Sequence, residues 1–225
     1  MEKNALIAGA TGLIGKSLAK QLANTGHYDN VFALVRKPVD LGSEKIKTIV
    51  CDFENLDGLD LPTISDLFCC LGTTIKKAGS QEAFRKVDFE YPLNFARWGR
   101  EQGAERYFIV TAIGANAKSS VFYNKTKGEA EDAITKLQFS STYFFRPSLL
   151  LGKRDEKRAG EDFAKTISGI MNLFLVGFLK KYRAIQASDV AKAICSVSVN
   201  SQKPEGLRIL ESDLIQKIAD TETNR

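Results

Sequence analysis

Tyr123 and Lys127 are the two residues of this sequence whose types and spacing best suit proton transfer. They lie four positions apart in YNKTK (residues 123–127), and this spacing places both side chains on one helical face. Reduction of a carbonyl by hydride leaves an alkoxide that must take up a proton. A tyrosine hydroxyl can donate it, although its ordinary pKa of about 10 suits a neutral site poorly. An adjacent ammonium favours the phenolate, so we expect Lys127 to make the hydroxyl a stronger acid.

The position of this pair in the chain separates a proton-transfer device from an ordinary amphipathic helix start that carries charge. Residues 106–112 (RYFIVTA) are predicted to form a strand, and residues 124–138 the helix that follows it. The pair would therefore lie near the carboxyl end of a strand, where the nicotinamide of a bound cofactor is expected. There Lys127 would also bond the nicotinamide ribose hydroxyls.

A third hydroxyl is expected to orient the substrate carbonyl. The end of the same strand offers Thr111, and the following loop offers Ser119 and Ser120 as weaker candidates. The alternative for Thr111 is a strand-end side chain that is hydrogen-bonded to the backbone.

A glycine-rich turn, GATGLIG (residues 9–15), joins the first predicted strand to the first predicted helix. In this position the glycine spacing is typical of a dinucleotide-binding turn. We expect Gly9 to permit the sharp turn, Gly12 to let backbone N–H groups approach a pyrophosphate, and Gly15 to bring the helix close to the sheet. The positive end of the helix dipole would hold the anion, and Thr11 would add a hydroxyl. The alternative is a glycine-rich turn that binds nothing.

The residues after the second predicted strand indicate which dinucleotide binds. In folds of this kind an acid roughly 20 residues beyond the glycine turn selects NAD. This sequence has Arg36 and Lys37 in that place. A guanidinium makes a bidentate, charge-assisted contact with a 2′-phosphate, which an acid would repel. NADP(H) is therefore the predicted cofactor, unless the two cations only solubilise a turn.

Two further strand ends are expected to contact the cofactor. Asp52 follows the third predicted strand and is placed to meet the adenine amino group, although a helix or turn cap is an equally fair interpretation. Leu71, Gly72 and Thr73 end the fourth predicted strand. Ligands in such sheets lie at the carboxyl ends of the strands, so these three residues should lie against the cofactor ribose.

The order of the elements predicts an α/β fold: a Rossmann, doubly wound parallel sheet with helices on both faces. Short apolar runs alternate with segments of helical period, and Pro92 and Ser188 are expected to interrupt and to cap helices. Residues 1–225 are predicted to form a single NAD(P)-binding Rossmann domain, with the part after about residue 152 as a small C-terminal extension on the substrate side. Strands are expected at 4–10, 30–36, 46–53, 64–72, 106–112, 141–147 and 206–211, and helices at 12–26, 80–102, 124–138, 159–179 and 188–199.

Composition excludes several other classes of protein. Hydrophobic residues make up 44% and charged residues 26% of the chain, which is ordinary for a globular protein. No apolar run approaches the roughly 20 residues of a membrane-spanning helix, and no signal-peptide layout is present, so we expect a cytoplasmic location and no membrane partner. The net charge of +5 is mild and spread out, which argues against nucleic-acid binding. A single histidine and no Cys-x-x-Cys pair argue against a metal site.

Together these motifs resemble the atypical branch of the short-chain dehydrogenase/reductase superfamily, over nearly the whole chain. The segments that carry this resemblance are GATGLIG, LVRKP, CDF, CLGTT, YNKTK, FRPSLLLG and SDVA. More narrowly, FCCLGTTIKKAG, RKVDFEY, KSSVFYNKTKGEAE and FRPSLLLGKRDEKRAGE resemble the Tat-interacting-protein oxidoreductase family. The resemblance implies a Rossmann fold that contacts NADPH through Thr11, Gly12, Leu13, Ile14, Arg36, Lys37, Leu71, Gly72, Tyr123, Lys127, Leu150 and Arg158.

One departure from the superfamily concerns its catalytic serine. That serine usually lies in a Ser-Ser-like pair, where this chain has Thr111 and Ala112. We therefore carry two hypotheses. The first is an NADPH-dependent reductase of a small carbonyl substrate, monomeric or homodimeric, with Tyr123 as the general acid. The second is an NADPH-binding sensor or interaction module with little or no catalysis; nucleic-acid binding is the weakest alternative.

Overall fold

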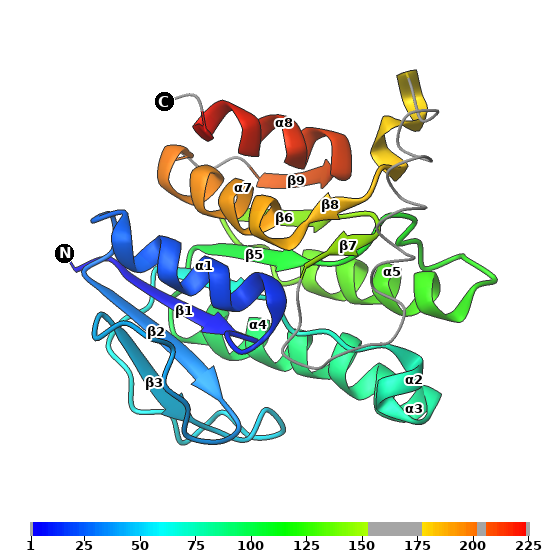
Figure 1. The fold of residues 1–225 in the computed structure, drawn as a ribbon. Helices are drawn as coiled ribbons and strands as arrows, with labels where there is room; N and C mark the ends of the chain where they lie inside the picture. Colours follow the sequence, from blue (N-terminus) through cyan, green and yellow to red (C-terminus); the bar gives the residue numbers. More distant parts are fainter. Residues whose placement is uncertain (1, 153–176, 202–205, 224–225) are drawn as a thin grey trace.

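The centre of the fold is a seven-stranded parallel sheet in the order β3-β2-β1-β4-β5-β6-β9 (Figure 1). The computed structural model describes residues 2–152, 177–201 and 206–223. The strand order reverses between β1 and β4, which is the crevice where open α/β sheets bind ligands. The strands are β1 (Asn4–Ala8), β2 (Asn30–Val35), β3 (Ile46–Val50), β4 (Asp66–Cys69), β5 (Arg106–Val110), β6 (Ser141–Arg146) and β9 (Gly206–Glu211).

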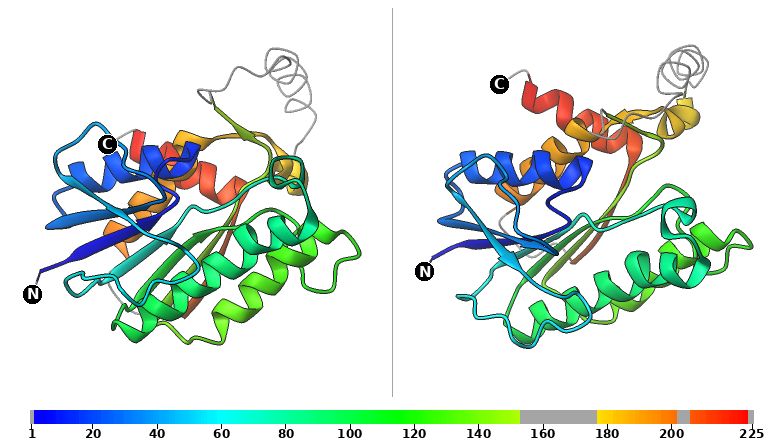
Figure 2. Two further views of the ribbon diagram at one scale, coloured as in Figure 1. Left: turned by 90° about the horizontal axis from the view of Figure 1, so that it is seen from below. Right: turned by 60° about the horizontal axis from the view of Figure 1, so that its bottom comes forward.

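Helices cover both faces of the sheet, which confirms the predicted Rossmann-like fold (Figures 1 and 2). One layer consists of α1 (Leu13–Asn24), α7 (Ala187–Asn200) and α8 (Ser212–Thr223), and the other contains α4 (Tyr91–Glu101) and α5 (Phe122–Thr135). Because successive strand side chains point to opposite faces, Ile7 packs in the core under the first layer and Leu6 in the core under the second. Within the described ranges, none of the helices combines the length and apolar character that a membrane crossing requires.

The segment predicted as one long helix over residues 80–102 is built from three pieces. It runs as α3 (Gln81–Arg85), the π-helical turn η1 (Lys86–Glu90) and α4. Pro92 lies in the first turn of α4, where its missing N–H costs little. The helical segment continues through Pro92, and its irregularity is the π-helical turn, which ends at Glu90, two residues before the proline. The short helix α2 (Ile75–Ala78) precedes this segment.

The carboxyl-terminal third departs from prediction in two details. Ser188 does not cap a helix, because α7 already begins at Ala187 and its N-cap is Gln186. The reason is that β8 (Ile185–Gln186) pairs with β7 (Leu150–Leu151) in a second, two-stranded sheet and the helix follows at once. Most of the helix predicted at 159–179 lies outside the described residues, and residues 177–182 form the 3₁₀ helix η2 (Gly177–Tyr182). Helix α8, which was not predicted, follows β9 directly.

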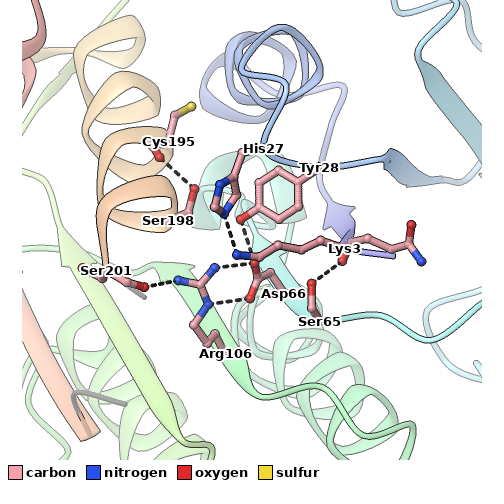
Figure 3. A network of polar contacts seen from close by, with 10 residues as sticks. Lys3, His27, Tyr28, Ser65, Asp66, Arg106, Cys195, Ser198 and Ser201 are labelled. Atoms are coloured by element: carbon pink, nitrogen blue, oxygen red, sulfur yellow. Dashed lines mark hydrogen bonds and ion pairs between the residues drawn. The ribbon is translucent and has the colours of Figure 1, made fainter. Parts of the chain in front are cut away.

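A buried polar network ties together the amino ends of the strands (Figure 3). The Arg106 guanidinium, at the start of β5, donates from Nε to Asp66 Oδ1 at 2.6 Å and pairs through Nη2 with Oδ2 at 2.5 Å. The Tyr28 hydroxyl donates to the same carboxylate at 2.7 Å, and Lys3 Nζ lies 2.6 Å from His27 Nε2. The bidentate contact between Arg106 and Asp66 compensates two charges that would be costly to bury separately. The network lies at the edge of the sheet opposite to the site described next.

Candidate cofactor and catalytic site

The glycine turn between β1 and α1 leaves no room for a side chain at Gly9 or at Gly15. Gly9 has a φ of +87°, and a Cβ added to it would lie 2.6 Å from the carbonyl carbon and oxygen of Cys70. A Cβ on Gly15 would lie 2.2 Å from the Gly9 oxygen, and one on Gly12 at 3.3 Å from it. Gly12 is the N-cap of α1 and makes no side-chain cap. The turn therefore exposes backbone beside the helix N-terminus, which fits the pyrophosphate of a dinucleotide.

The strand ends around this turn hold the residues predicted for the adenosine half of the cofactor. Arg36 and Lys37 follow β2 directly and are exposed. Asp52 lies after β3, where its Oδ1 accepts the backbone N–H of Glu54 at 3.0 Å. This bond is the turn cap of the second interpretation of Asp52, and it uses one carboxylate oxygen, so the contact with the adenine amino group stays a prediction.

Lys127 is almost completely buried on α5 and paired with an acid. The residue is 4% exposed, and its Nζ lies 2.7 Å from Oδ1 of Asp88 in η1. A Cβ added to Gly72, just beyond β4, would lie 3.9 Å from the same Nζ. The ammonium therefore lies at the carboxyl edge of the sheet, beside the backbone predicted to meet the cofactor ribose.

Tyr123 lies one turn before Lys127, as the second residue of α5. It is half-buried, and its ring centroid lies 5.5 Å from that of Phe84, a fully buried residue of α3. The predicted order of strand, loop and helix start at this point is therefore correct. The two residues expected to transfer a proton share one face of α5 at the strand ends.

Opposing effects set the pKa of Lys127. Burial lowers it, because a charged ammonium loses hydration inside the protein. The Asp88 carboxylate raises it and Tyr123 raises it further, so the pKa of Lys127 lies above its ordinary value of 10.5. The ammonium is therefore charged at neutral pH. A charged ammonium is the state that stabilises a phenolate next to it.

Thr111 is held in a buried network with a second acid of α5. Its Oγ1 donates to Glu131 Oε1 at 2.6 Å and lies 3.4 Å from the carbonyl oxygen of Phe145. Arg146, at the end of β6, donates to both oxygens of Glu131. The proton of the Thr111 hydroxyl is thus engaged within the protein, which favours the strand-end role of this residue.

The remaining predicted contacts lie around the glycine turn and the end of β4. Leu71 is half-buried against the core, and the backbone N–H of Thr73 donates to Asp88 Oδ2 at 2.9 Å. Leu150 packs against the core that contains α1. A Cβ on Gly152 would lie 3.4 Å from Leu13 Cδ2, so β7 ends beside the glycine turn. Arg158 lies outside the described residues.

Two acids of the site were not predicted from the sequence. Glu131 lies four residues after Lys127 and shares its helical face, so the same spacing rule identifies it. Asp88 carries no such signal, because it lies in another helical segment and reaches Lys127 only through the tertiary fold. Among the described residues, no group of three or more histidine, cysteine or acidic side chains gathers as metal ligands would.

Comparison with known sequences places most of the chain in one family. The family model described as "NAD dependent epimerase/dehydratase family" matches residues 5–209. A Candida albicans protein named "Protein FMP52, mitochondrial" is 34% identical over 227 residues, covering 96% of this chain and 97% of that protein. The rat "Protein HTATIP2" is 34% identical over 177 residues, covering 74% of this chain and 71% of that protein. The resemblance to the Tat-interacting-protein family is thereby confirmed.

The same comparison corrects one expectation. The predicted cytoplasmic location is wrong, because the Candida albicans relative and others that match along almost the whole chain are named as mitochondrial proteins. The prediction rested on two absent patterns, a long apolar run and a signal-peptide layout, and neither absence distinguishes cytosol from mitochondria.

Solved structures share the fold. "MoeE5 in complex with UDP-glucose and NAD" has a TM-score of 0.67 at 18% identity, covering 98% of this chain and 82% of that one. "Crystal Structure of human epimerase family protein SDR39U1 (isoform2) with NADPH" has a TM-score of 0.62 at 17% identity, covering 92% of this chain and 74% of that one. The chain belongs to the NAD-dependent epimerase/dehydratase family, and it shares a Rossmann-like fold with these solved structures.

Proposed function

We propose that this protein is an NADPH-dependent oxidoreductase that reduces a small carbonyl compound, with Tyr123 as the general acid. The observation that carries the proposal is the position of Lys127: a buried ammonium beside the end of β4, close enough to Tyr123 for the two groups to interact electrostatically. Ligands of open α/β sheets bind at this edge. A proton donor supported by a fixed cation is what an alkoxide formed there requires.

The cofactor assignment is supported by the glycine turn and by Arg36. The turn leaves backbone rather than side chains beside the N-terminus of α1, and Arg36 and Lys37 are exposed after β2, where an NAD-selecting acid would otherwise lie. The name of the family refers to NAD, and one solved structure with the same fold contains NADPH. Proteins of this fold therefore bind either dinucleotide. The two cations favour NADP(H).

Each residue then has a defined role. NADPH, when bound, supplies the hydride. The backbone N–H groups of the glycine turn bind the pyrophosphate, and Arg36 binds the 2′-phosphate. Lys127 bonds the nicotinamide ribose hydroxyls and stabilises the phenolate that remains after Tyr123 has protonated the substrate oxygen. Thr111 contributes by holding Glu131, and through it α5, because its hydroxyl proton is already donated to that carboxylate.

A mitochondrial location belongs to the same proposal. Relatives that match along almost the whole chain are named as mitochondrial proteins. Immunoblotting of purified mitochondria and cytosol from cells that express the native chain tests this. Recovery in the cytosolic fraction alone would contradict it.

The decisive experiment compares the wild type with Tyr123→Phe. NADPH binding is measured by fluorescence titration, and turnover is measured with a panel of aldehydes and ketones. We expect the substitution to leave NADPH binding nearly unchanged and to lower turnover by about 10²- to 10⁴-fold, the usual contribution of a general acid. Equal behaviour of the two proteins would refute the reductase and favour the NADPH-binding sensor.

A further inference from the structure

Asp88 is a buried acid with its two oxygens directed at two parts of the site. The residue is 1% exposed. Its Oδ2 accepts the backbone N–H of Thr73 at 2.9 Å, and its Oδ1 lies 2.7 Å from the Nζ of Lys127. Among the described residues Oδ1 accepts no hydrogen bond of regular geometry, so the ion pair is its compensation. One side chain therefore joins the loop after β4 to the buried face of α5.

The backbone that presents Asp88 is unusual. Asp88 is the middle residue of the π-helical turn η1, between α3 and α4. A π-helical turn inserts an extra residue into a helix and shifts the direction of its side chains, and such turns are frequent at functional sites. The adjoining α3 carries Phe84, whose ring packs against Tyr123. The same helical segment thus contacts both members of the Tyr123–Lys127 pair.

We propose that Asp88 is a positioning residue of this site: it holds the Lys127 ammonium, in its charged form, beside Tyr123 and the end of β4. For its role in catalysis the inference rests on the proposed function, whereas the ion pair can be tested without turnover. The physical reason is burial. An isolated buried lysine tends to lose its proton, because the charged form has lost its hydration. The carboxylate reverses that tendency, and among the described residues Tyr123 and Cys69 also raise the pKa of Lys127.

Removal of the Asp88 charge has a consequence for the pH dependence of turnover. A reductase that protonates an alkoxide needs both the hydroxyl of Tyr123 and the ammonium of Lys127 in their protonated forms. Without the negative charge of Asp88, which lies 2.7 Å from its Nζ, the ammonium of Lys127 should lose its proton at lower pH. Asp88→Asn should therefore shift the basic limb of the kcat/KM profile to lower pH.

The chain offers a matched control for this substitution. Asp66 and Arg106 form a second buried ion pair, at the opposite edge of the sheet (Figure 3). Asp66→Asn, like Asp88→Asn, leaves a buried cation unpaired. The difference is that lysine can relieve the strain by losing its proton, whereas arginine stays charged at any pH at which the protein folds. Comparison of Asp88→Asn with Asp66→Asn therefore separates the general loss of stability caused by an unpaired buried cation from an effect on the charge of Lys127.

The experiment measures the Tm of wild type, Asp88→Asn and Asp66→Asn from neutral pH to about pH 10, together with kcat/KM profiles in NADPH. We expect both variants to have a lower Tm than the wild type at neutral pH. As the pH rises, this Tm deficit should shrink far more for Asp88→Asn than for Asp66→Asn, and only Asp88→Asn should shift the basic limb of the kcat/KM profile. A deficit of Asp88→Asn that stays constant with pH, or a basic limb that matches that of the wild type, would overturn the proposal.

A second variant keeps the proposal falsifiable if Asp88→Asn does not fold. Asp88→Asn combined with Lys127→Met removes both charges, and it should be more stable than Asp88→Asn alone, because no unpaired cation is left buried. A double variant that is no more stable would overturn the proposal. If the wild type itself turns over no carbonyl compound, the proposed function fails, and the Tm comparison still decides the role of Asp88.

Discussion

The hydroxyl of Thr111 donates a hydrogen bond of 2.6 Å to Glu131, which joins the end of β5 to the buried face of α5. Glu131 lies one turn beyond Lys127 and two turns beyond Tyr123 on the same helix. Two buried polar contacts, Thr111–Glu131 and Asp88–Lys127, thus determine how α5 presents its first turn at the edge of the sheet.

Thr111→Val is expected to act mainly through stability. The substitution keeps the shape of the side chain and removes a hydrogen bond to a charged group, which costs about 1.5–3 kcal/mol of the free energy of unfolding. Turnover should fall far less than in Tyr123→Phe. Denaturant unfolding and a turnover assay check both expectations. Thr111→Ser, which keeps the hydroxyl, is the control; a loss of turnover in Thr111→Val as large as that in Tyr123→Phe would show that the hydroxyl contacts the substrate.

Gly9→Ala is expected to disrupt the glycine turn. The added Cβ would lie 2.6 Å from the Cys70 backbone, and the alanine would have to adopt a φ of +87°, which side chains disfavour. We expect at least a tenfold weaker affinity for NADPH, together with a loss of stability. Gly26→Ala is the control, because Gly26 has a φ of +67° but nothing within 4 Å of the added Cβ. It should cost about 1–2 kcal/mol from the backbone conformation alone and leave NADPH affinity unchanged. Fluorescence titration of both variants with NADPH distinguishes the effect of the contact with Cys70 from the effect of the positive φ.

Arg36→Asp is expected to reverse the cofactor preference. The substitution replaces a guanidinium that can pair with a 2′-phosphate by an acid that repels it and can accept bonds from ribose hydroxyls. The ratio of the NADPH and NADH dissociation constants should change by at least about tenfold, or 1.4 kcal/mol. Lys217→Asp makes the same change of charge on the exposed side of α8 and should leave the ratio unchanged. A wild type that prefers NADH would refute the NADPH assignment.

His27 is expected to make the protein less stable at mildly acidic pH. Burial lowers the pKa of His27, and the positive charges of Lys3 and Arg106 lower it further. A histidine with a lowered pKa stays neutral in the folded state at a pH at which the unfolded chain already binds a proton. Stability is therefore lost as the pH falls below about 6.5. The Lys3–His27 contact of 2.6 Å explains the effect, since two cations cannot occupy it (Figure 3).

The substitution His27→Gln tests this effect cleanly, because the chain has a single histidine. The variant should lose less Tm than the wild type between about pH 7 and pH 5.5. Equal losses in the two proteins would show that the carboxylates, rather than His27, determine stability in this range.

Much of the fold and part of the site could be predicted from local patterns. The alternation of apolar runs with helical segments predicted the strands of the sheet, because period and length distinguish the two kinds of element. The spacing of Gly9, Gly12 and Gly15 predicted a sharp turn that brings the helix close to the sheet, and the structure shows the close contacts at Gly9 and Gly15 that require glycine there. The four-residue spacing of Tyr123 and Lys127 predicted that they share a helical face, and the place of their helix after a predicted strand indicated that they lie at a strand end.

The partners of these residues came only from the tertiary structure. Asp88 meets Lys127 because a π-helical turn changes the direction of its side chain and because α3, η1 and α4 pack beside α5. Thr111 meets Glu131 rather than facing the site alone, because α5 lies over the end of β5. Local periodicity determines which residues share a face of one element. Contacts between elements depend on how the crossovers pack on the sheet, so the charges that control the buried lysine could be identified only after the chain had folded.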